Sequence, residues 1–115
     1  MPEALRIINL ESGLPTGDEA VKRLSEAIEA AKRDGVRALK VIHGYGSSGV
    51  GGVLRQRVQK SLANRRNQGK IRACVFGENW NSFEKVARDV LDQCPALRRD
   101  ADLNRNNVGI TIVLL

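Results

Sequence analysis

Residues 40–58 constrain the fold of this chain more than any other stretch. Their sequence is KVIHGYGSSGVGGVLRQRV: an apolar run reaches the only histidine, His43, passes through five glycines from Gly44 to Gly52, and continues as a helix-like pattern. In such an arrangement the glycines let backbone N–H groups approach an anion, and the dipole of the following helix favours negative charge. The stretch therefore predicts a strand, a loop and a helix that together could cradle a phosphate.

The rest of the chain repeats this alternation of strand-like and helix-like patterns. Amphipathic helices are expected from the capping box Thr16–Glu19 to Gly35, from about Gly51 to Asn67, and over residues 82–94. Mostly apolar, strand-like runs are expected at residues 5–10, 36–43, 71–76 and 108–115.

This order predicts an α/β fold, namely a two-layer β-α-β-α-β-α-β sandwich with a mixed, largely parallel four-stranded sheet. We expect a single domain over residues 1–115, because the chain has no repeats or linkers and is long enough for one core. The last run is apolar throughout, which predicts a central strand. The polar residues 96–107 predict a long loop, with room for a short helical turn.

The third helix is expected to carry one apolar face. Asn81 or Ser82 is expected to cap it, and Pro95 to stop it. The apolar positions at helical spacing are Phe83, Val86, Ala87, Val90, Leu91 and Cys94.

The carboxyl ends of the first three strands are expected to meet at one edge of the sheet. Right-handed crossovers bring successive strand ends together, and ligand sites of open α/β sheets usually lie at that edge. The edge would gather Glu11–Gly13, the loop from His43 to Gly52, and Gly77–Trp80. It is therefore the expected place of a functional site.

Positive charge is concentrated in one region. The net charge is +6, and residues 35–77 contain nine basic residues but no Asp or Glu, whereas the remainder is slightly acidic. A regional basic field favours a polyanionic partner such as nucleic acid, and the alternative is a merely solvated helix face. The expected phosphate contacts are Arg55, Arg57, Lys60, Arg65, Arg66, Lys70 and Arg72.

The composition predicts a folded cytoplasmic chain that does not enter the membrane. Hydrophobic residues make up 42% of it, but no apolar run approaches the roughly 20 residues of a membrane span. The first residues also lack the pattern of a signal peptide.

Three segments, read together, resemble the small MutS-related (Smr) domain family. The sequence IHGYG at 42–46 resembles the family's IHGKG or HGxG signature, and residues 52–58 resemble its G-x-L-R-x-x-V. Residues 106–114 resemble GG-x-G-A-T-x-V-x-L, and Gly17–Ala20 resembles the start of the family's first helix. The resemblance covers most of the chain.

This resemblance implies a fold similar to the C-terminal domain of translation initiation factor three, and binding of DNA or RNA. Several family members also cut nucleic acid. The family's LDLHG motif is altered here, because its Asp falls on Asn9 and its His falls on Glu11 or Ser12. The helix over 82–94 resembles an insertion. The chain is thus similar to a divergent member, and whether it is an endonuclease is left open.

His43 is the residue on which any histidine-dependent chemistry would rest. It could act as a general acid or bond a phosphate when protonated, or it could instead bond backbone carbonyls and shape the loop. Glu11 could form an acid/base pair with His43 if their strands are neighbours. These two residues are the candidate catalytic groups, and no metal ligand is predicted.

The candidate binding residues surround the glycine loop. Tyr45 could stack on an unpaired base, whereas Trp80 either does the same or covers the core. The nucleic-acid-binding set is His43, Gly44, Tyr45, Gly46, Ser47, Ser48, Arg55, Arg57, Lys60 and Arg66.

Two alternatives to simple nucleic-acid binding follow from the same residues. The first is a metal-dependent nicking endonuclease, which would require a divalent metal and carboxylates such as Glu11 and Glu78 near His43. The second is a protein-interaction module whose basic face meets an acidic partner. No cofactor is expected for binding alone.

Overall fold

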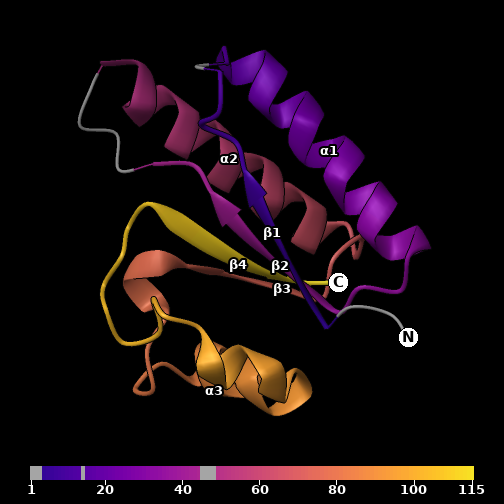
Figure 1. Ribbon diagram of the computed structural model, residues 1–115, viewed down its shortest axis with the longest axis vertical. Helices are drawn as coiled ribbons and strands as arrows, with labels where there is room; N and C mark the ends of the chain where they lie inside the picture. The colour runs from indigo at the N-terminus through magenta and orange to yellow at the C-terminus, as the bar shows by residue number, and fades with distance from the viewer. Residues whose placement is uncertain (1–3, 14, 45–48) are drawn as a thin grey trace.

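Four strands and three helices follow one another in the order that the sequence predicts (Figure 1). The computed structural model describes residues 4–13, 15–44 and 49–115, and the side chains of all of these except 49–53. The elements are β1 (Leu5–Asn9), α1 (Gly17–Arg33), β2 (Ala38–Ile42), α2 (Gly49–Asn67), β3 (Ala73–Phe76), α3 (Lys85–Gln93) and β4 (Ile110–Leu114), with 3₁₀ turns η1 (Gly77–Asn79) and η2 (Pro95–Arg99).

The sheet is mixed, with strand order β1-β2-β4-β3. β1 and β2 pair in parallel, and β4 is antiparallel to both of its neighbours, β2 and β3. Three strands therefore run in one direction, as a largely parallel sheet requires, although only one of the three pairings is parallel. The predicted central position of the last strand is confirmed, and all five residues of β4 are buried.

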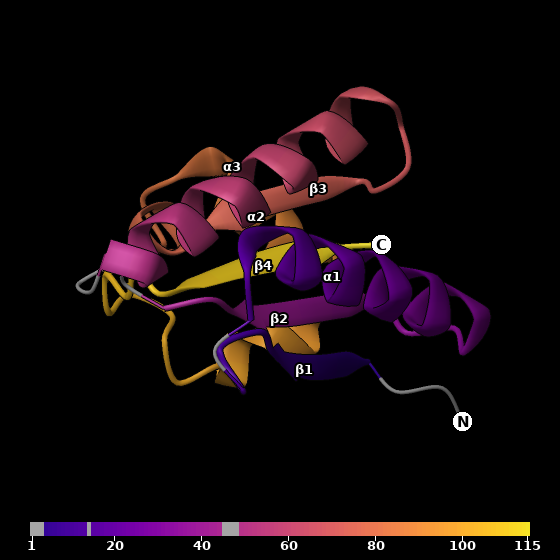
Figure 2. The same ribbon diagram turned by 90° about the horizontal axis from the view of Figure 1, so that it is seen from above.

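The predicted α/β fold with a mixed four-stranded sheet is confirmed, and helices cover both faces of this sheet, which adds a layer to the expected sandwich. α1 and α2 lie on one face and α3 lies on the other (Figures 1 and 2). Val113 of β4 packs in the core with α1 and α2, whereas Ile110 and Ile112 pack in the core with α3. Since side chains alternate between the two faces of a strand, a fully apolar central strand needs a covering layer on each side.

The first helix begins and ends at the predicted residues. The Thr16 hydroxyl oxygen accepts a hydrogen bond from the Glu19 backbone N–H at 3.2 Å, and Gly35 has the positive φ of +73° typical of a residue that follows a helix.

The third helix begins later than predicted, at Lys85. The Asn81 side-chain oxygen accepts from the backbone N–H groups of Phe83 and Glu84 at 2.9 and 3.2 Å, and it thereby closes a turn that precedes the helix. Phe83 belongs to this turn and is 90% exposed, so it does not share the buried face formed by Ala87, Val90, Leu91 and Cys94. No helix in the described part of the chain is long and apolar enough to cross a membrane.

Candidate nucleic-acid interface

The carboxyl ends of β1, β2 and β3 lie at one edge of the sheet, as the sequence predicts. The Leu10 backbone N–H donates to the Ile42 carbonyl at 2.8 Å, which ties the end of β1 to the end of β2. The N–H groups of His43 and Gly44 both donate to the Gly109 carbonyl at 3.0 Å, which adds the start of β4. We call this part of the surface, from Glu11 across Gly44 to Glu78, the carboxyl edge.

His43 is fully buried at this edge, and both of its ring nitrogens are hydrogen-bonded within the protein. Nδ1 lies 3.0 Å from the Gly44 carbonyl oxygen, and Nε2 lies 2.9 Å from the Thr111 hydroxyl oxygen. A carbonyl oxygen can only accept, so Nδ1 donates, and a neutral ring then accepts the Thr111 hydroxyl at Nε2.

The electrostatic surroundings of His43 favour this neutral form. Burial lowers its pKa below the ordinary value of 6.5, and the nearby Arg55 charge lowers it further. The hydrogen bond to Gly44 and the carboxylates of Glu78 and Glu11 oppose these effects only in part. At neutral pH the imidazole is thus uncharged, and its nitrogens bind Thr111 and Gly44.

The backbone conformation of Gly44 favours glycine at this position, because its φ of +87° lies in the left-handed region. The exposed carboxylate of Glu11 lies against it, so a Cβ added at Gly44 would push the end of that side chain aside. The Asn9 side-chain oxygen accepts from the Glu11 backbone N–H at 2.9 Å and so holds the Glu11 backbone after β1. Of the two residues at the altered family motif, Glu11 therefore lies against Gly44 of the HGxG segment, and Asn9 holds the Glu11 backbone.

Arg55 connects the start of α2 to the end of β3. Its guanidinium lies 3.2 Å from the Glu78 carboxylate, and the side chains are 28% and 33% exposed. The charges of Arg55 and Glu78 both act on His43. The structure thus brings together Glu11, His43, Arg55 and Glu78, which are up to 67 residues apart in the sequence.

Two of the predicted phosphate contacts on α2 bind α1 instead. Arg57 forms an ion pair with Asp18 in the first turn of α1, and Arg65 donates to the Ser25 hydroxyl at 2.7 Å. These side chains hold the two helices together.

Lys60 and Arg66 are exposed on α2, and neither forms an ion pair with any residue that the structure describes. Arg66 lies on the side of α2 that faces β3, where it lines a hollow with Cys74, Phe76 and Asn79. These two cations of α2 are therefore available to an anion, whereas Arg55 is paired with Glu78.

Lys40, one of the nine basic residues of the central region, is buried and faces the opposite side of the sheet. Its ammonium group lies 2.7 Å from Asp100 and 2.5 Å from Asp102, and the Trp80 indole N–H donates to Asp100 at 2.9 Å. Burial alone would lower the pKa of Lys40, but these carboxylates raise it, and the hydrogen bond from Lys40 lowers the pKa of Asp102. The buried Trp80 confirms the interpretation that it covers the core.

Sequence reasoning did not identify this buried cluster. The sequence signal for this cluster is Lys40, a single lysine inside an otherwise apolar strand. Because a buried ammonium group requires carboxylate partners, such a lysine indicates a buried ion pair.

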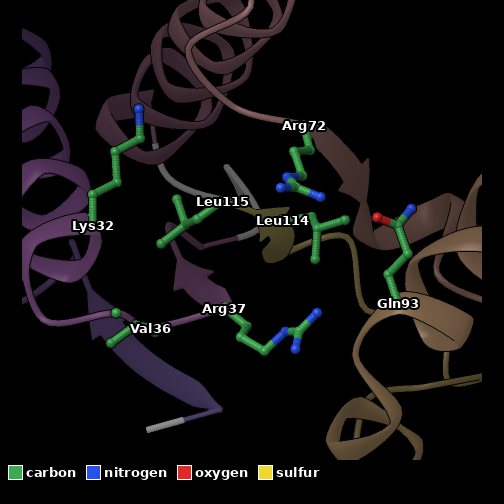
Figure 3. A pocket seen from close by; sticks show the side chains of 8 residues that line it. Lys32, Val36, Arg37, Arg72, Gln93, Leu114 and Leu115 are labelled. Atoms are coloured by element: carbon green, nitrogen blue, oxygen red, sulfur yellow. The ribbon is translucent and has the colours of Figure 1, made fainter. Parts of the chain in front are cut away.

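Another basic hollow lies at the opposite edge of the sheet, where β2 and β3 begin (Figure 3). It has a volume of about 280 Å³, and Arg37 and Arg72 extend into it beside Leu114 and Gln93. Arg72 therefore lies at the edge of the sheet opposite to Gly44.

Four predicted binding residues, Tyr45, Gly46, Ser47 and Ser48, lie outside the described residues. Within the described ranges, no group of three or more His, Cys, Asp or Glu side chains has the arrangement of a metal site.

Comparison with known proteins identifies the family. The sequence profile of the Smr domain matches residues 12–78, which is more than half of the chain, whereas a search of curated proteins found no match. Among solved structures, the fold is similar to the Smr domain of Thermus thermophilus MutS2, with a TM-score of 0.58, 21% identity, and 96% of each chain covered. This chain therefore belongs to the Smr domain family.

Proposed function

We propose that this Smr domain binds nucleic acid through the carboxyl edge and the adjoining side of α2. The proposal rests on Lys60 and Arg66, which lie on the helix that follows the HGxG segment. Both side chains are exposed, and neither forms an ion pair with the described residues. Both lie in a stretch of 43 residues, 35–77, that contains no acidic side chain. Since guanidinium and ammonium groups bind phosphate oxygens regardless of base identity, such a surface suits the phosphate backbone.

In this proposal His43 is a positioning residue. Its buried ring joins β2 to Thr111 of β4 and bonds the Gly44 carbonyl, so it fixes the direction in which the chain enters the glycine loop. Arg55 contributes a guanidinium that Glu78 holds at the start of this surface.

A binding assay with matched variants tests the proposal. Fluorescence anisotropy is measured with labelled single-stranded, duplex and branched DNA and with RNA, for the wild type and for Lys60→Gln/Arg66→Gln. The control is Lys22→Gln/Arg33→Gln, which removes the same charge from exposed positions of α1, among acidic neighbours. We expect the first variant to bind every probe more weakly and the control to bind like the wild type.

Equal weakening in the two variants would contradict the placement of the surface on α2. If no probe binds at low salt, the protein-interaction alternative, with an acidic partner, replaces nucleic-acid binding.

The endonuclease alternative rests on Glu11, the exposed carboxylate that packs against Gly44. Because both nitrogens of His43 are already bonded, a cutting reaction at this edge would depend on Glu11 as its base. Incubation of plasmid DNA with Mg²⁺ followed by gel electrophoresis measures nicking. Nicking that persists unchanged in Glu11→Gln would exclude this role, and nicking lost in that variant alone would support it.

A further inference from the structure

Phe83 is the most exposed large apolar side chain among the described residues. It is 90% exposed, although burial of a phenyl ring is worth about 1.5–3 kcal/mol. The ring lies in the turn between η1 and α3, beyond the segment matched by the Smr family profile. An aromatic ring that the fold leaves in solvent calls for a role other than packing.

The turn that carries Phe83 is held firmly by neighbouring side chains. The Phe83 N–H donates to the Asn81 side-chain oxygen at 2.9 Å, and its carbonyl accepts from the Arg88 guanidinium at 2.8 Å. The next residue back, Ser82, donates its backbone N–H to the Asn104 side-chain oxygen at 2.8 Å. These bonds fix the backbone on both sides of the ring, so the ring is presented to solvent by a built turn.

A hollow of about 420 Å³ adjoins this ring, and amide side chains line it. The lining residues are Glu78, Asn81, Ser82, Phe83, Asn104 and Asn106. The side-chain oxygens of Asn81 and Asn104 each accept a hydrogen bond from a backbone N–H group. The NH₂ group of each side chain points away from that bond and can act as a donor. Asn104 and Asn106 have positive φ of 66° and 54°, a conformation that asparagine adopts more readily than most residues.

We propose that Phe83 and this hollow form a stacking site for an unpaired nucleobase. The ring supplies a flat apolar face, the asparagine NH₂ groups supply donors for base carbonyls and ring nitrogens, and Glu78 supplies an acceptor for an exocyclic amino group. Glu78 is also bonded to Arg55, so the hollow continues directly from the proposed phosphate-binding surface. The inference thus rests on the proposed function and adds a preference for strands that contain unpaired bases.

The experiment uses the whole chain and oligonucleotides with 2-aminopurine at one unpaired position. Variants Phe83→Ala and Phe83→Tyr are compared with the wild type, and Ile7→Ala is the control because Ile7 is 61% exposed on the edge strand β1. Stacking of a base on one aromatic ring contributes to the binding free energy. Its loss in Phe83→Ala should therefore weaken binding to single-stranded or bulged DNA by about tenfold. Duplex affinity should stay unchanged, because paired bases cannot enter the hollow.

The fluorescence of 2-aminopurine gives a direct signal of stacking. We expect quenching with the wild type and Phe83→Tyr, none with Phe83→Ala, and full quenching with Ile7→Ala. If Phe83→Ala binds duplex and bulged probes as the wild type does, the stacking site is overturned, but the phosphate-binding surface is not. Absence of binding to every probe overturns the proposed function and this inference together.

Discussion

The buried imidazole of His43 accounts for two neighbouring features of the carboxyl edge. Through Thr111 it attaches the end of β2 to β4, and through the Gly44 carbonyl it sets the first turn of the glycine loop. The sequence made His43 a candidate for acid–base chemistry. Its burial and its two hydrogen bonds support the alternative that it shapes the loop.

His43 should make stability depend on pH in a narrow window. Its folded pKa lies below 6.5, so the unfolded chain takes up a proton that the buried ring does not, and the free energy of unfolding falls as pH decreases below about 6.5. Urea denaturation between pH 5 and 7.5 measures this slope. His43→Gln should be less stable at pH 7.5 but should lose most of the slope, and parallel curves for the two proteins would contradict the assignment.

Gly44→Ala should cost more stability than the same change at Gly69. Both glycines have positive φ, +87° and +74°, which costs about 1–2 kcal/mol for an L-residue. No atom lies within 4 Å of a Cβ added at Gly69, whereas at Gly44 it meets Glu11.

Addition of Glu11→Ala to the Gly44→Ala protein should recover the difference between the two sites. Chemical denaturation of the wild type, Gly44→Ala, Glu11→Ala and the double variant closes the double-mutant cycle. Equal losses of stability at the two glycines would show that the Glu11 contact has no effect on the free energy of unfolding.

Among the secondary-structure elements, polar side chains form links between parts of the chain that are distant in the sequence. Arg57 and Arg65 join α2 to α1, whereas Lys40 joins β2 to the segment that follows η2. Sequence patterns, which depend on residues near one another, predicted the three helices, although the third begins at Lys85 and not at residue 82. They could not show these attachments, because Lys40 and Asp100 are 60 residues apart.

Lys40→Met should strongly destabilise the fold. It leaves the Asp100 carboxylate, whose side chain is 4% exposed, without its cation, and loss of one partner of a buried pair costs about 3–5 kcal/mol. Arg98→Met is the matched control, because it removes an exposed pair with Asp92 at 3.2 Å and should cost no more than about 1 kcal/mol. Thermal unfolding compares them, and similar midpoints would contradict a structural role for Lys40.

At the scale of the whole molecule, the surface charges divide into separate regions. Lys60 and Arg66 lie on α2, whereas Arg37 and Arg72 lie at the opposite edge of the sheet. The net charge of +6 therefore overstates the charge that one bound strand can contact.

The salt dependence of duplex binding should report how many cations contact phosphates. Each neutralised phosphate contributes a slope of about −0.9 in log K against log salt concentration. Lys60→Gln/Arg66→Gln should flatten the slope by about 1.8, whereas Arg37→Gln/Arg72→Gln should leave it unchanged. Anisotropy titrations from about 50 to 200 mM salt measure it, and equal flattening in both variants would show that both edges bind.

The candidate site was predictable from sequence only in part. The positions of Glu11, His43 and Glu78 at one edge followed from strand order, since parallel strands end together. The partner of His43 did not, because Thr111 lies 68 residues away on a strand whose place in the sheet no local pattern specifies. Phe83 was expected on the apolar helix face, and the turn closed by Asn81 placed it in solvent instead.

The sequence alone predicts the elements, the central place of the last strand, the edge that carries the candidate site and the resemblance to the Smr family. These depend on periodicity, capping and turn residues, which act over a few positions along the chain. The folded molecule shows, for the residues it describes, which charges are neutralised, which remain available to an anion, and which aromatic ring faces solvent. The physical reason is that burial and ion pairing depend on neighbours that the sheet order brings together from distant parts of the chain.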